Sequence, residues 1–94
     1  MKWVGRAPFI YNRTMTLADT EYSQVLPAGV TKVLVQCRGS YDMKMGFAEN
    51  QSGNFYITIK NGSIYYEDLV DGSRTLYIQC PTAGQVAEIL AWVR

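Results

Sequence analysis

The residue types that most often carry catalysis are scarce in this chain of 94 residues, which contains no histidine. Neither a Ser-His-Asp nor a Cys-His arrangement can therefore form. A lysine could act as a base instead, but Lys32, Lys44 and Lys60 fall at outward-facing positions of strand-like segments, where a solvated charge is the ordinary interpretation. The sequence predicts a protein that is not an enzyme.

The acidic residues closest to one another are Glu67, Asp68 and Asp71. Two carboxylates can hydrolyse a glycosidic bond, whereas a calcium site needs more oxygen ligands at defined spacing than this segment offers. Glu67 and Asp68 end a strand-like run that enters a turn at Asp71 and Gly72. We interpret these side chains as a solvated turn, and we expect neither a metal ion nor a cofactor.

The two cysteines, Cys37 and Cys80, each end a strand-like run and share the parity of its apolar residues. We therefore expect two buried thiols that act as small hydrophobic side chains. A disulfide between them would require Cα atoms within about 7 Å of each other. Two cysteines without histidine make a poor zinc site.

Aromatic side chains are the feature that most strongly indicates binding. Tyr56, Tyr65 and Tyr77 have the parity opposite to that of the apolar residues in their segments. If their strands are adjacent, these tyrosines form an exposed patch that can stack on sugar rings or pack against another protein. Alternatively, each tyrosine covers its own strand separately. The residues expected to face the core in these segments are Phe55, Ile57, Ile59, Leu76 and Ile78.

Short alternations of apolar and polar residues, each closed by a turn with Gly, Pro, Asn or Asp, run from Thr16 to Trp92. In the run 31–38 the apolar residues other than Leu34 alternate with polar residues and share one face. Leu34 lies on the polar face, which indicates that this face is partly covered. The Asn61-Gly62 dipeptide lies between two such runs, 55–60 and 63–67. Since both central residues of a type I′ turn have positive φ, this dipeptide predicts that the two runs pair as a β-hairpin.

The two ends of the chain allow alternatives. Residues 1–14 are aromatic and basic and are broken by Gly5 and Pro8, so they form either a first strand or an arm that docks on a neighbour. Residues 85–94 fit a helical spacing as well as an apolar strand. The preceding Pro81 and Gly84 favour a short closing strand that is covered on both faces.

These patterns predict one all-β domain, an antiparallel sandwich of seven to eight strands of jelly-roll type. Residues 15–94 form the sandwich, and residues 1–14 are its arm or first strand. A chain of this length makes a single domain.

The composition argues against several classes of partner. The net charge is +1, and the nine Lys and Arg residues form no basic stripe, so we expect no binding to nucleic acid. No segment approaches the ~20 apolar residues of a transmembrane helix, and residues 1–4 are not followed by the apolar run of a secretion signal. We therefore expect no membrane association, and a location in the cytoplasm of the producing cell or in a particle assembled there.

The segment 16–38, TLADTEYSQVLPAGVTKVLVQCR, resembles a class of short tailed-bacteriophage and prophage proteins. Those proteins have a similar polar lead, a Leu-Pro-Ala-Gly-type turn and a Lys-x-x-x-Gln-Cys-Arg-type strand. The likeness continues at 64–68, 75–80 and 82–84 and in a terminal strand ending near Trp92. It covers most of the chain after Met15, and it consists of fold-level markers.

The resemblance implies a non-enzymatic virion protein, with capsid decoration as the expected role. A head-fibre base, a neck component and a tail component are the other roles it allows. The expected partners are the major capsid protein or another virion protein, together with further copies of the chain in a homo-oligomer, and the expected location is the virion, assembled in the host cytoplasm. The alternative function is a carbohydrate-binding module or a fibre or tail adhesion domain. The residues expected to make contacts are Trp3, Phe9, Ile10, Tyr11, Tyr56, Tyr65 and Tyr77.

Overall fold

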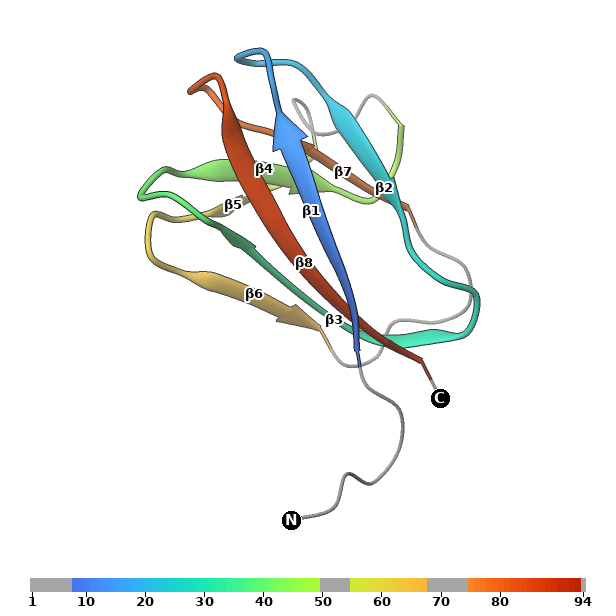
Figure 1. Cartoon of the computed structure of the whole chain (residues 1–94). Coiled ribbons are helices and arrows are strands. Elements are labelled where there is room, and N and C mark those ends of the chain that lie inside the picture. The colour runs from blue at the N-terminus through green and yellow to red at the C-terminus, as the bar shows by residue number, and fades with distance from the viewer. Residues whose placement is uncertain (1–7, 50–54, 68–74, 94) are drawn as a thin grey trace.

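Eight β-strands and no helix make up the regular structure of this computed structural model, which describes residues 8–49, 55–67 and 75–93 (Figure 1). This confirms the prediction of an all-β fold. The strands are β1 (Phe9–Met15), β2 (Tyr22–Val25), β3 (Val30–Cys37), β4 (Met43–Gly46), β5 (Ile57–Ile59), β6 (Ile64–Glu67), β7 (Thr75–Gln79) and β8 (Gln85–Val93).

The strands form two four-stranded sheets, with the order β1-β8-β3-β6 in sheet A and β2-β7-β4-β5 in sheet B. Every neighbouring pair is antiparallel. The chain folds back on itself in nested pairs, β4 with β5, β3 with β6, β2 with β7 and β1 with β8, and successive pairs alternate between the sheets. This is the strand order of a jelly roll, so the predicted fold class is confirmed.

The core lies between the inner faces of the two sheets. Sheet A contributes alternate residues of β3 and β8, and sheet B contributes alternate residues of β4 and β7, as expected for strands with one buried face. Ile59 is buried, as are the predicted core residues of β7. The fully buried large side chains are Met15, Met43, Met45, Leu76, Ile78, Ile89, Val30, Val33, Val35 and Cys80.

The predicted hairpin at Asn61 and Gly62 is wrong, because β5 pairs with β4 and β6 pairs with β3. Ser63 N donates to Lys60 O at 2.8 Å, and Gly62 has a φ of 79°. Asn61 lacks the positive φ of a type I′ turn, so the turn has the φ signs of type II. Asn61 N donates to the Asp42 carboxylate at 2.6 Å. This corner therefore carries the chain from sheet B to sheet A.

The end segments both supply strands of sheet A. Strand β1 pairs with β8 along its whole length, so residues 9–14 belong to the first strand, and residues 1–7 lie outside the described residues. Strand β8 lies between β1 and β3, which confirms the strand interpretation of residues 85–93. Its inner residues are buried, but Leu90 and Trp92 on its outer face are half-buried, so the expected cover on both faces is incomplete.

Candidate protein-binding surfaces

An apolar row crosses all four strands on the outer face of sheet A. Ile10 of β1 pairs with Leu90 of β8, which also pairs with Leu34 of β3. Leu34 in turn pairs with Tyr66 of β6. Ile10 is 67% exposed and Tyr66 51%, whereas the two leucines between them are half-buried. We call these four residues the sheet A row. With strands about 4.8 Å apart, the row spans roughly 14 Å.

A polar row lies beside the sheet A row, and its side chains are held in place. The Glu88 carboxylate accepts hydrogen bonds from Arg38 Nε and Gln36 Nε2, both at 2.9 Å. The hydrogen bond from Arg38, followed by that from Gln36, holds the pKa of Glu88 below its ordinary value. An apolar strip beside a polar rim is typical of protein interfaces.

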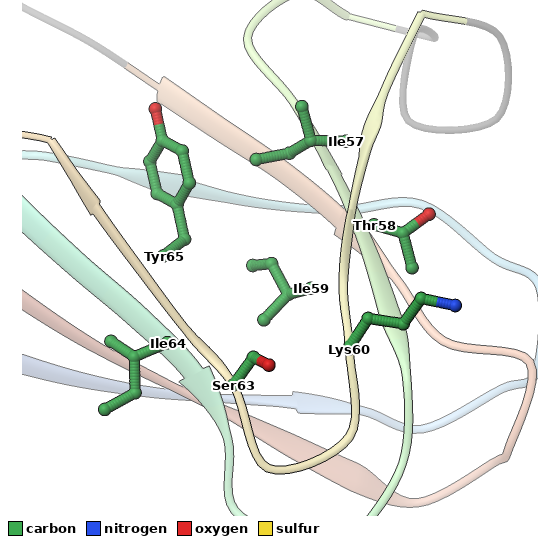
Figure 2. Close-up of a pocket in the computed structure, with 7 residues that line it drawn as sticks. All are labelled: Ile57, Thr58, Ile59, Lys60, Ser63, Ile64 and Tyr65. Atoms are coloured by element: carbon green, nitrogen blue, oxygen red, sulfur yellow. The ribbon is translucent and has the colours of Figure 1, made fainter.

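A second apolar surface lies where the β5 edge of sheet B meets the β6 edge of sheet A. A cleft of about 140 Å³ opens there. Figure 2 shows Ile57 and Ile59 pointing from β5 toward Tyr65, while Thr58 and Lys60 point away. The Phe47 ring lies 6.3 Å from the Tyr65 ring, so an aromatic pair joins the end of β4 to β6. The lining residues are Ile57, Thr58, Ile59, Lys60, Ser63, Ile64 and Tyr65.

Exposed large apolar side chains gather at this β5–β6 edge. Six of the eleven that are exposed in the described chain lie on β5 or β6, directly before β5, or against Tyr65. Phe55 is 80% exposed and Ile57 40%, so neither is buried in the core as predicted, although Ile57 pairs with the buried Met45 and has the inward parity. The reason is that β5 is a three-residue edge strand, and no described strand covers its outer side. The six are Phe47, Phe55, Tyr56, Ile57, Ile64 and Tyr66.

At the opposite edge of the sandwich, a side chain of β1 contacts a side chain of β2. Arg13 pairs with the buried Ala87 and so has the inward parity of β1. Its guanidinium lies 5.6 Å from the centroid of the Tyr22 ring, and the Tyr22 hydroxyl accepts a hydrogen bond from Leu17 N at 2.9 Å. An inward-pointing charge on an edge strand is a common protection against edge-to-edge pairing.

Tyr56 and Tyr77 lie on the outer face of sheet B. Tyr77 pairs with Gly46 of β4, and the ammonium of the outward-facing Lys44 lies 4.8 Å from the centroid of the Tyr56 ring. Tyr77 is half-buried and Tyr56 is exposed. The structure therefore places two of the three predicted tyrosines on one face.

The alternative in which all three tyrosines form one patch does not hold, because β6 is not adjacent in a sheet to β5 or β7 and Tyr65 lies apart from the other two. Tyr65 pairs with the buried Val35 and packs against the core from sheet A, since β6 belongs to that sheet. The Tyr65 hydroxyl donates to Glu67 Oε2 at 3.4 Å. Burial raises the pKa of Tyr65, and the neighbouring Glu67 carboxylate raises it further.

The predicted contact residues near the N-terminus have different environments. Phe9 and Ile10 are exposed, Tyr11 is half-buried against the core, and Trp3 lies outside the described residues.

The sequence interpretation missed most of the sheet A row and the outer face of β6. These surfaces depend on the register of four strands, which no local pattern contains. The one signal in the sequence was Leu34, an apolar residue at a polar parity.

The remaining chemically active groups are dispersed. Both cysteines are free thiols; Cys80 is buried and Cys37 is half-buried at the core. Cys80 Sγ donates to Asp42 O at 3.3 Å, and burial raises the pKa of the thiol. Within residues 8–49, 55–67 and 75–93, no group of three or more His, Cys, Asp or Glu side chains could hold a metal ion. Asp68, Asp71 and Gly72 lie outside these ranges.

No protein-family model, curated protein or solved structure matches this chain. The described residues contain no apolar helix of membrane-spanning length. Among the described residues, the sheet A row and the β5–β6 edge are the two surfaces with the exposed apolar side chains of a binding site.

Proposed function

We propose that this protein is a non-enzymatic structural component of a phage virion, namely a capsid decoration protein that binds major capsid protein subunits and stabilises the shell. The sequence likeness of residues 16–38 to tailed-phage and prophage proteins supports the virion assignment. The observation that carries the binding role is the sheet A row, an apolar strip that crosses all four strands on the outer face of sheet A.

The energetics of the row favour docking on a protein surface. Full burial of an isoleucine side chain contributes about 1.5–3 kcal/mol. Ile10 is 67% exposed, so covering it adds roughly 1–2 kcal/mol. Tyr66 adds to this from the other edge, and its ring loses little conformational entropy on binding. When many copies bind one shell, the favourable free energy of each contact adds to the stability of the shell, and no chemical reaction is required.

In the proposed contact, the outer face of sheet A binds the shell. The sheet A row is the apolar centre of this contact, and the hydrogen-bonded side chains of Glu88, Gln36 and Arg38 form its polar rim. Further copies of the chain are the second proposed partner. The protein acts in the virion, and neither nucleic acid nor membrane is part of the proposed contact.

The test is binding of the purified protein to shells of the encoding phage that were assembled without it, measured by co-sedimentation. Ile10→Lys on β1 places a charge in the row and is expected to weaken binding at least tenfold, or about 1.4 kcal/mol. Val25→Lys is the matched control, because Val25 is 65% exposed on β2, an edge strand of the other sheet. Failure of the wild-type protein to bind shells, or equal losses in both variants, would contradict the proposal.

A carbohydrate-binding or fibre adhesion domain is the second candidate, because Tyr56 and Tyr77 share the outer face of sheet B. Retention of the protein on a glycan array, lost in Tyr77→Ala and retained in Ile10→Lys, would favour this candidate. The Lys44 ammonium already lies over the Tyr56 ring, which reduces the free aromatic surface for stacking on a sugar.

A further inference from the structure

We propose that a second copy of the chain pairs with β6 in antiparallel orientation, so that two A sheets join into one eight-stranded sheet across a two-fold axis. This inference deepens the self-association part of the proposed function by naming its strand and register. The proposed pairing uses the β6 edge of sheet A. The substitution of the shell-docking test, Ile10→Lys, lies on β1 at the opposite edge of the sheet.

The first observation is that the two edges of sheet A differ. Strand β6 is the last strand of the sheet in the described chain, and Figure 1 shows it at the outside of the fold. Its residues 64–66 carry no charge, and Ile64 is 56% exposed. The β1 edge instead has Arg13 turned inward over Tyr22. The charged residue of β6, Glu67, lies at the end of the strand, where it is half-buried and accepts a hydrogen bond from the Tyr65 hydroxyl. The uncharged stretch 64–66, with its exposed apolar side chains, is a template for pairing with another strand.

The second observation is that the β6 sequence complements itself. Residues that face each other across an antiparallel pair point to the same side of the sheet. If the outer faces of the two A sheets are to form one face, each outward residue of β6 must therefore lie opposite an outward residue of β6 in the second copy. A two-fold axis at Tyr65 places Ile64 opposite Tyr66 of the second copy, and Tyr66 opposite Ile64 of the second copy. Pairs of an aromatic and a β-branched residue are among the favourable cross-strand pairs. Both side chains are more than half exposed in the single chain.

The third observation is the exposed apolar surface below β6. A two-fold axis normal to sheet A also brings the β5 edge of one copy toward the β5 edge of the other. Ile57 and Phe55 then enter the same interface, beside the cleft lined by Ile59 and Tyr65. A second copy of the chain accounts for the exposed residues at both β6 of sheet A and β5 of sheet B, because an isologous contact buries the same surface on each of the two copies.

The test is the oligomeric state of the purified full chain alone, measured by sedimentation equilibrium over a wide concentration range. The wild-type protein is expected to reach a dimer. Ile64→Lys and Tyr66→Glu are each expected to raise the dimer dissociation constant at least tenfold. The double variant places opposite charges across the axis and is expected to recover most of this loss, which depends on the proposed register.

Two controls separate this inference from a general loss of solubility or fold. Val25→Lys, on the β2 edge, is expected to leave the dimer unchanged. Ile10→Lys is expected to dimerise normally while losing shell binding, so failure of the docking proposal and failure of the pairing proposal give different results. Thermal melts verify the fold of each variant, and Ile64→Thr replaces Ile64→Lys if the latter unfolds. A wild-type monomer at every concentration, an unrescued double variant, or an equal loss in Val25→Lys would overturn the inference.

Discussion

Two neighbouring residues of β8 provide the strongest test of the sandwich and of its outer face. Ile89 lies on the inner face and is 0% exposed, whereas the adjacent Leu90 lies on the outer face in the sheet A row. Substituting each by alanine removes a similar apolar volume from the same strand. We expect Ile89→Ala to destabilise the protein strongly and Leu90→Ala to destabilise it only weakly.

The magnitudes follow from burial. Truncation of a buried isoleucine to alanine costs about 2–5 kcal/mol, because the lost transfer free energy is increased by the cavity that remains. At Leu90 no closed cavity forms, since its outer side is open to solvent. Half of a full burial term of about 1.5–3 kcal/mol leaves roughly 1 kcal/mol. The two variants therefore differ by about 1–4 kcal/mol in unfolding free energy. One kcal/mol shifts the Tm of a domain of this size by about 4–8 °C, so their Tm values are expected to differ by at least ~4 °C.

The assay is chemical and thermal unfolding of both variants, followed by circular dichroism under identical conditions. Shell binding is measured in parallel, and Leu90→Ala is expected to lose affinity while it retains its fold. Equal destabilisation by the two substitutions would show that both faces of sheet A are covered. That result would refute the two-layer arrangement and remove the sheet A row as a docking surface.

Three further outcomes follow from single contacts. The pKa of Glu88 is lowered in the folded protein, so the stabilisation by its carboxylate is complete above the ordinary pKa of 4.5 and is lost as the pH falls through the folded-state pKa. The difference in unfolding free energy between wild type and Glu88→Gln is therefore expected to shrink on acidification. A difference that stays constant with pH would contradict the hydrogen-bonded carboxylate. Gly62→Ala is expected to cost about 1–2 kcal/mol, since Gly62 has a φ of 79°, and an unchanged midpoint in urea would contradict the turn geometry. Cys80 is expected to resist a thiol reagent in the native protein and to react after denaturation, because it is 0% exposed, and rapid native labelling at Cys80 would refute its burial.

The sequence predicted the parts of the fold that depend on local alternation. Val33 and Val35 face the core, and residues 85–93 form a strand, because a period of two is visible within each segment. The hairpin prediction failed because the Asn61-Gly62 dipeptide reports a turn but not the sheet to which each strand belongs. The Asp42 carboxylate, 19 residues away, holds the Asn61 amide at the corner between the sheets. Such a contact cannot be read from a local pattern.

The candidate surfaces were harder to predict than the core. Tyr65 and Tyr66 are adjacent in sequence, and the partner strand alone decides which one faces inward; the pairing of β6 with β3 turns Tyr65 toward the core and Tyr66 outward. Ile57 has an inward parity but remains exposed because its strand is an edge. Parity predicts the face of a residue, and strand order decides whether that face is covered.

The strand order also relates the two proposed contacts to each other. In sheet A, β1 and β6 are the two edges, so Ile10 lies at the far end of the row from the strand proposed to pair with a second copy. Pairing at β6 would place two sheet A rows on one face of a continuous eight-stranded sheet, which is roughly 34 Å wide over seven strand spacings. The two rows would be offset along the strands, because Tyr66 faces Ile64 of the second copy and Ile64 pairs with Gln36. A dimer that docks through both rows gains effective concentration for the second contact. Ile64→Lys is therefore expected to bind shells more weakly than the wild-type protein, although its Ile10, Leu90 and Leu34 side chains are unchanged. Equal shell binding by the two proteins would mean that each copy docks independently of its neighbour.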